Sequence, residues 1–166
     1  MSKTRNLISA SLFAVAAAFA SAPAQSADIV TVASEAGTFN TLLAAAQAAG
    51  MADFFAGGAS APMTLFAPTD EAFAALGQDA IDALLADPEA LREVLMYHVV
   101  LREIPSSALR NREVHSLYMM NFGHLNVWTT QSGVRLGDIG GSARVVTADI
   151  EADNGVIHVI DQVLMP

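Results

Sequence analysis

The sequence predicts an α+β fold, with helices in the N-terminal half of the domain and β-strands in the C-terminal half. Up to His98, apolar residues recur at helical spacing between helix start and stop signals. From Val99 onward the pattern changes to short β-branched and aromatic runs, separated by turn residues. Between two of these runs lies Asn154-Gly155, which is a strong signal for a β-hairpin. These observations favour a cluster of helices packed on a sheet.

The N-terminal half is predicted to hold four helices and one strand. The first helix covers residues 28–36, and the second follows Thr38, which can cap it. A short apolar strand is expected at 63–67, and Thr69 can cap the helix that comes after it. The fourth helix spans 88–98, because proline is well suited to a first helical position.

The C-terminal half is predicted to form four strands, at 124–130, 134–139, 143–150 and 156–164. With Asn154 and Gly155 as a two-residue loop, the hairpin register pairs Glu151 with His158. Six apolar residues of the hairpin then share the face expected to be the core side: Val146, Ile150, Ala152, Ile157, Val159 and Val163.

Residues 1–24 have the pattern of a secretory signal peptide. Two basic residues open the chain, an apolar run covers 7–20, and small residues follow. The run is shorter than the ~20 apolar residues of a membrane-spanning helix. We expect cleavage after Ala24, with Ala27 as the alternative site, and a single domain at 28–166. The mature protein is expected to be soluble, without stable membrane insertion, in the periplasm or outside the cell.

Composition limits the classes of partner. The chain has 53% hydrophobic residues, no cysteine and a formal net charge of -9 at pH 7. Because disulfides are excluded, the stability of an exported protein must come from its core alone. Nucleic acid is not expected as a partner, since phosphate binding depends on clustered lysine and arginine. A bare anionic membrane surface is disfavoured for the same reason.

Three segments together resemble the fasciclin-domain family. They are TLFAPTDEAF at 64–73, LREVLMYHVV at 91–100 and NGVIHVIDQVLMP at 154–166. The resemblance covers 28–166 and implies a wedge or sandwich of β-strands with N-terminal helices packed on it. Within these segments we expect structural roles for five residues: Thr69, Asp70, Asn154, Gly155 and His158.

The resemblance also implies a function in adhesion and protein binding, without catalysis. The expected partners are a protein or a surface polysaccharide. Because bridging two surfaces requires at least two attachments, adhesion also predicts self-association or a second binding face. An alternative is a periplasmic protein that maintains the envelope through weak protein contacts, and a hydrolase is a further alternative.

Two segments are candidates for binding. Tyr97 and His98 belong to the tyrosine-histidine segment, which the resemblance associates with receptor contact in some members. Both also follow an apolar helical stripe, so burial is the alternative, and Asp70 is then a candidate hydrogen-bond partner for His98. Consecutive bulky residues at 117–122, with Tyr118, Met119 and Phe122, suggest a sticky surface, because tyrosine, methionine and phenylalanine are enriched in interface cores. A fully buried strand is the alternative for this segment.

No chemical motif emerges from the sequence. The four histidines lack the short spacing of a zinc site, so no metal is expected. Residues 149–160 differ from a calcium loop, because Asn154 and Ile160 stand where a glycine and a bidentate acid belong. His158 is expected to pair with Glu151 at the surface. Neither a nucleophile motif nor a cofactor loop is found, although paired carboxylates of a glycosidase would leave no such signature.

Overall fold

The computed structural model of the 166-residue chain describes residues 27–110, 116–120, 123–131, 133–138 and 141–166. The predicted signal peptide, residues 1–24, lies outside the described residues. The elements follow in the order α1 (Ile29–Ala36), α2 (Asn40–Ala48), η1 (Phe54–Gly58), β1 (Met63–Pro68), α3 (Asp70–Leu76), α4 (Gln78–Ala86), α5 (Pro88–Tyr97), β2 (Val99–Val100), α6 (Ser106–Arg110), β3 (Ser116–Tyr118), β4 (His124–Thr130), β5 (Gly133–Asp138), β6 (Gly141–Ala152) and β7 (Gly155–Ile160). The α+β prediction is confirmed.

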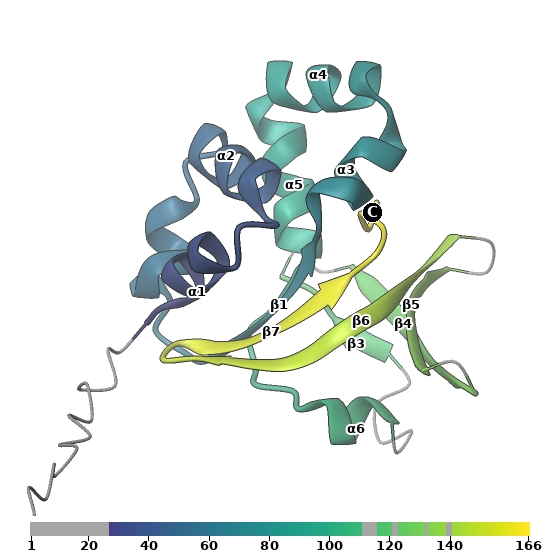
Figure 1. Ribbon diagram of the computed structural model, residues 1–166. Helices are drawn as coiled ribbons and strands as arrows, with labels where there is room; N and C mark the ends of the chain where they lie inside the picture. The colour runs from purple at the N-terminus through teal and green to yellow at the C-terminus, as the bar shows by residue number, and fades with distance from the viewer. Residues whose placement is uncertain (1–26, 111–115, 121–122, 132, 139–140) are drawn as a thin grey trace, which may run out of the picture.

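The strands form a strongly bent mixed sheet in the order β2-β1-β7-β6-β5-β4-β3. Strands β1 and β7 are parallel, and the other neighbouring pairs are antiparallel. The twelve-residue β6 pairs with β5 through its first part and with β7 through its second part. It therefore carries the bend between the two halves of the sheet, as Figure 1 shows.

Helices α1 to α5 gather on one side of β1 and β7, whereas α6 lies on the opposite side of the sheet (Figure 1). The buried apolar residues accordingly form two clusters. The first joins α1, α2, α3 and α5 to β1 and β7. The second joins α6 to β4, β5 and β6, and the fully buried Phe66 of β1 also belongs to it.

The sequence signals for helix ends are mostly confirmed. The Asp28 carboxylate accepts a hydrogen bond from the Thr31 amide at the start of α1, and Gly37 ends this helix with φ 69°. Thr69 caps α3 through its hydroxyl group. The predicted cap at Thr38 is wrong, because α2 starts at Asn40 and takes its cap from another part of the chain.

Candidate functional site

The tyrosine-histidine segment ends α5, a helix with a strong start signal. The Asp87 carboxylate accepts hydrogen bonds from the Glu89 and Ala90 amides, each at 3.1 Å. A buried stripe of leucine and valine then holds the helix against α2 and β2. Helix α5 ends at Tyr97, and His98 is its C-cap.

The end of α5 meets the turn between β3 and β4. The half-buried Tyr97 donates its hydroxyl hydrogen to the carbonyl oxygen of His124 at 3.0 Å. In the same turn, the Met120 amide donates to the Val99 carbonyl oxygen at 2.9 Å. We call the surface formed by Tyr97, Met120, Gly123 and His124 the α5–β4 junction. The two segments predicted as binding candidates thus lie side by side in space.

The other candidates of the second segment have different positions. Met119 is 1% exposed, so it supports the junction from the core and does not line its surface. The backbone of Tyr118 pairs with His124 in the sheet. The side chain of Tyr118 and the whole of Phe122 lie outside the described residues.

His98 is buried beneath the junction, at 1% exposure. Its Nδ1–H donates to the Val94 carbonyl oxygen at 2.7 Å, and its Nε2 accepts from the Leu164 amide at 2.9 Å. Because an amide only donates, Nε2 carries no proton and the ring is neutral. Burial lowers the pKa of His98 to about 4, although the bond to Val94 favours the charged ring. The imidazole therefore ties the C-terminal segment to α5.

The predicted contact between Asp70 and His98 is wrong. The Asp70 carboxylate accepts instead from the Thr41 amide at 2.8 Å and from the Asn40 amide and side chain at 3.3 and 3.1 Å. The physical reason is that the first amides of α2 lack a local cap. Burial raises the pKa of Asp70, but the bonds from Thr41 and Asn40 outweigh it and hold the pKa below its ordinary value.

Asn154 connects three elements of the fold. Its side-chain oxygen accepts from the Ile29 amide at 2.9 Å, and its side-chain NH₂ donates to the Phe55 carbonyl oxygen at 2.7 Å. Its own carbonyl oxygen accepts from the Met63 amide at 3.1 Å. The side chain that predicted a turn therefore also fixes α1 and η1 against the sheet.

The predicted hairpin between β6 and β7 is confirmed, but its loop lies one residue earlier than predicted, so that the strand pairings next to the loop are shifted by two residues. Ala152 pairs with Gly155, so the loop is Asp153-Asn154 and does not contain the glycine. Gly155 has φ 154° and faces β1, where an added Cβ would lie 1.9 Å from the Met63 carbonyl oxygen. Only a glycine fits at this position, because the parallel strand β1 passes so close to it. The local sequence does not reveal this contact.

Strand β6 contains two register irregularities between 145 and 150. They turn Val146 outward to 47% exposure, so its predicted place in the core is wrong. Glu151 pairs with Val156, and the predicted surface pair between Glu151 and His158 is wrong as well. His158 is fully buried, because β7 is covered on both faces.

The buried His158 belongs to a polar bridge that the sequence analysis missed. Its Nε2–H donates to the Ile104 carbonyl oxygen at 2.7 Å, and its Nδ1 accepts from the Asp149 amide at 3.2 Å. The Asp149 carboxylate accepts from the Ser106 amide at 2.7 Å and from the Ser106 hydroxyl group. Asp149 has φ 59°, a left-handed conformation that nothing in its strand-like sequence predicts. In the local sequence, Pro105 followed by Ser106 is a helix-start signal for α6.

In this bridge the His158 ring is neutral and the Asp149 carboxylate is charged. Burial lowers the pKa of His158, although the Ile104 carbonyl and the Asp149 charge act in the opposite direction. Burial raises the pKa of Asp149, but hydrogen bonds from Ser106 and the charges of His158 and Arg110 lower it below its ordinary value.

Ser106, His158 and Asp149 are the residue types of a hydrolytic triad, but their contacts are not those of one. In a triad the histidine accepts the proton of the serine hydroxyl group, and the acid orients the histidine. Here the serine hydroxyl donates directly to the acid, and the histidine Nε2–H donates to a carbonyl oxygen. The set has no contact between a nucleophile and a base, so it serves as structural support.

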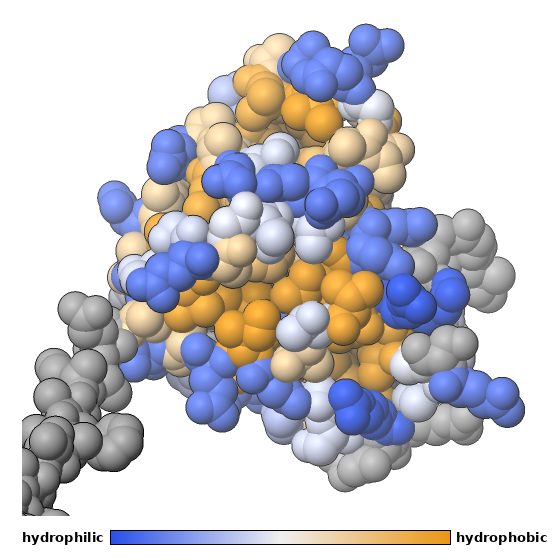
Figure 2. Space-filling view, viewed as in Figure 1, coloured by the Kyte–Doolittle hydropathy of each residue, from blue (hydrophilic) through white to orange (hydrophobic). Residues whose placement is uncertain are grey.

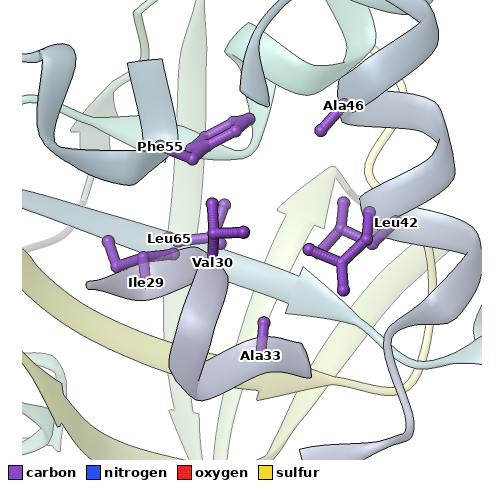
Figure 3. Close-up of a pocket in the computed structure, with 8 residues that line it drawn as sticks. Ile29, Val30, Ala33, Leu42, Ala46, Phe55 and Leu65 are labelled. Atoms are coloured by element: carbon purple, nitrogen blue, oxygen red, sulfur yellow. The ribbon is translucent and has the colours of Figure 1, made fainter. Parts of the chain in front are cut away.

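One cavity lies among α1, α2, η1 and β1, and Figure 3 shows the apolar side chains that line it, including Ile29, Leu42 and Phe55. Its volume is about 10 Å³. A single water molecule needs roughly 10–15 Å³ and several polar partners. This space is therefore a packing gap of the core and too small for a ligand.

The described residues contain neither a cluster of metal ligands nor a membrane-spanning helix. Within the described ranges, no three His, Asp or Glu side chains come close enough to hold a metal ion. In that part of the chain, no helix is sufficiently long and apolar to cross a bilayer. Figure 2 shows polar side chains over the helix ends and an apolar band where the helices meet β6 and β7.

The family model of the fasciclin domain matches residues 37–166. The chain belongs to the fasciclin domain family. Protein sll1483 of Synechocystis sp. is 40% identical to this fasciclin protein over 141 residues, which are 83% of this chain and 73% of the relative. The transforming growth factor-beta-induced protein ig-h3 of Sus scrofa is 34% identical over 129 residues, or 78% of this chain and 18% of that protein.

A solved structure supports the fold of this fasciclin domain. The FAS1 domain pair from the insect cell adhesion molecule Fasciclin I matches with a TM-score of 0.62 and 24% identity. The match covers 78% of this chain and 46% of that chain. Fasciclin domains are generally involved in cell adhesion or protein interaction, and the family is generally non-enzymatic.

Proposed function

We propose that this fasciclin domain is an exported, non-enzymatic adhesion module that binds a protein or a surface polysaccharide through the α5–β4 junction. The observation that carries the proposal is the contact between the two predicted binding segments. The Tyr97 hydroxyl group reaches the His124 carbonyl oxygen, and the Met120 amide reaches Val99. Two segments that are distant in sequence, 27 positions apart at the Tyr97–His124 contact, thus supply one surface.

The chemistry of the junction suits recognition. Tyr97 and Met120 are half-buried, His124 is exposed, and Leu101 nearby in sequence is 50% exposed. Tyrosine offers a large contact area with few rotatable bonds, and methionine adapts to different partners. Beneath them, the hydrogen bonds of His98 hold α5 against the C-terminal segment. A rigid base of this kind reduces the entropy lost on binding.

The relatives and the predicted leader support export and adhesion. The insect neighbour is a cell adhesion molecule, and the signal-like pattern at 1–24 favours passage out of the cytoplasm. Fractionation of cells that express the full chain tests this part. A processed form outside the cytoplasm is expected, whereas an unprocessed cytoplasmic form contradicts export. Confinement to the periplasm would favour contacts within the envelope over contacts between cells.

The binding experiment uses the protein from Gln25 onward, applied to intact cells and to extracted surface material. Tyr97→Ala is expected to weaken saturable binding tenfold or more, because it removes a central aromatic contact. Tyr97→Phe, which keeps the ring, is expected to weaken binding only a few-fold. Leu85→Ala is the matched control, since Leu85 is also an exposed hydrophobic residue but lies on α4.

Circular dichroism and thermal unfolding establish that each variant is folded. Equal binding by folded Tyr97→Ala and unaltered protein would contradict the proposed site. Loss of binding in Leu85→Ala, with Tyr97→Ala unaffected, would move the site to the helical end of the molecule.

A further inference from the structure

A second cavity lies between α6 and the bent part of the sheet, and its size suits a small ligand. Its volume is about 120 Å³, against about 10 Å³ for the gap among α1, α2 and η1. Apolar cavities of roughly 150 Å³ accommodate molecules the size of benzene. The space beneath α6 is therefore large enough for about five non-hydrogen atoms.

The walls of this cavity are mostly apolar, with Ser106 as a polar residue and Arg110 as the charged one. Leu109, Val134, Val145 and Val146 contribute hydrocarbon surface from α6, β5 and β6. Arg110 is the charged residue of the lining, and its guanidinium group is always protonated. An apolar chamber with a cation at its edge is complementary to an apolar group that carries an anion.

The charge distribution of the chain supports an anionic ligand at this place. Residues 27–100 contain ten acids and one arginine, whereas residues 101–148 contain five arginines and three acids. The segment that supplies all eight lining residues therefore has two more basic than acidic residues, and the acidic Asp149 follows it directly and bonds to Ser106 of the lining. The charge of Arg110 also acts on Asp149, so the affinity for a second anion is expected to be modest.

Two irregular parts of the backbone lie beside the cavity: the register shifts of β6 and the left-handed Asp149. The two irregularities of β6 contain Val146 and Ala148, and both of these residues line the cavity. Asp149, in its left-handed conformation, holds the start of α6 through two hydrogen bonds to Ser106. Bulges and strained residues are over-represented beside functional sites, because they direct particular side chains.

We propose that the α6–β6 cavity binds a small monocarboxylate with an apolar tail of about five carbons, with the tail between the valines and the carboxylate on Arg110. This inference is independent of the proposed adhesion at the α5–β4 junction. Hexanoate is a probe of this size, and ligand efficiencies of small molecules predict a dissociation constant on the order of millimolar.

The test is an NMR titration of the ¹⁵N-labelled protein from Gln25 onward with hexanoate, 1-hexanol and acetate. Hexanoate is expected to shift the amide signals of Gly133, Val134 and Ala148 in a saturable manner. Hexanol lacks the charge and acetate lacks the tail, so each is expected to bind at least fivefold more weakly. Absence of saturable shifts around the cavity at about 50 mM hexanoate would overturn the proposal.

Two variants test separately the contribution of the Arg110 charge and that of the cavity volume. Arg110→Gln is expected to weaken hexanoate binding at least fivefold, and Ala148→Phe is expected to fill the space and abolish binding. Arg102→Gln is the control, because Arg102 is an exposed arginine outside the lining. Arg110 is exposed and buries no side chain, so Arg110→Gln is expected to fold, and the test does not depend on whether Ala148→Phe folds. Unchanged affinity in Arg110→Gln, or equal binding of hexanol and hexanoate, would overturn the assignment of an anion.

Discussion

Most helix starts on the helical side of the molecule are capped locally, whereas the start of α6 depends on a distant residue. On the helical side, three helix starts are capped by a residue next to the helix: Asp28, Thr69 and Asp87. Around α6, Ser106 bonds to Asp149, 43 residues further on. The first kind of contact is encoded in a few neighbouring residues, whereas the second exists only after the chain has folded.

Each region also contains one buried histidine, and the two rings perform the same task. His98 bridges α5 and the C-terminal segment, and His158 bridges the loop before α6 and strand β6. Both rings donate to a carbonyl oxygen and accept from an amide, and burial lowers both pKa values. Neutral imidazole suits such positions because it offers one donor and one acceptor.

The largest expected effect is at Gly155, where β7 of the hairpin joins β1. Gly155→Ala places a Cβ against the Met63 carbonyl oxygen and forces two strands apart. We expect the free energy of unfolding to fall by about 4 kcal/mol or more, as measured by urea denaturation. Gly37→Ala is the matched control, because Gly37 has φ +69° with nothing within 4 Å of the added carbon, and about 1 kcal/mol is expected there. Similar losses in both variants would contradict the role of the close contact.

The second effect is loss of stability in acid, through the buried histidines. Between pH 6.5 and about 4 the unfolded chain binds the proton of His98 more readily than the folded protein does. The stability is therefore full above the unfolded pKa, falls as the pH decreases, and for His98 alone declines by about 3 kcal/mol by pH 4. His158 acts in the same direction. The lowered pKa values of Asp70 and Asp149 cause further loss as the pH falls below their ordinary value of 3.8.

Urea denaturation at a series of pH values measures this slope. His98→Gln is expected to flatten it, because the variant has no ring to protonate, even if its stability at pH 7 is lower. His124→Gln is the control, since His124 is exposed. A slope that is unchanged in His98→Gln would show that other groups cause the acid sensitivity.

The third effect concerns a long-range contact on the helical side. Asn154→Ala leaves the Ile29 amide and the Phe55 carbonyl without partners. We expect a loss of about 2 kcal/mol and faster hydrogen exchange in α1 and η1, because partly buried polar groups lose their hydrogen bonds. Unchanged exchange in α1 would mean that packing alone holds this helix.

The smallest effect is expected at a local cap. Asp87→Ala is expected to reduce the free energy of unfolding by about 1 kcal/mol, through the two amides that the carboxylate caps. Asp53→Ala is a suitable comparison, because Asp53 also precedes a helical turn but makes no side-chain cap bond. If Asp87→Ala destabilises the protein more than Asn154→Ala does, the contrast between local and long-range contacts is wrong.

Much of the fold was predictable because its signals are local. Gly37 ends α1 and Pro88 starts α5, as expected, and the four predicted C-terminal strands correspond to β4, β5, β6 and β7. The nine-residue α4 was missed, as were the short η1 and α6, for which five residues are too few for a periodic pattern. The hairpin register was misplaced because the irregularities of β6 and the contact of Gly155 with β1 depend on neighbouring strands.

The candidate site was only partly predictable. The sequence singled out Tyr97 and the 117–122 segment separately, from residue type and resemblance. Their meeting at the α5–β4 junction depends on the sheet order, which no local pattern contains. The partners of His98 were beyond sequence reasoning for the same reason, because one of them, Leu164, is 66 residues away.

By itself, the sequence determined where most helices and strands begin and end, the acidic balance, and the absence of disulfides. Capping residues, turn residues and apolar periodicity act over a few positions, so they can be identified along the chain. The tertiary structure alone decided which amide Asp70 caps, which strand Gly155 faces, and which carbonyl groups the two histidines bind. These choices follow from the packing of distant segments, where every buried donor and acceptor must find whichever partner the fold brings close.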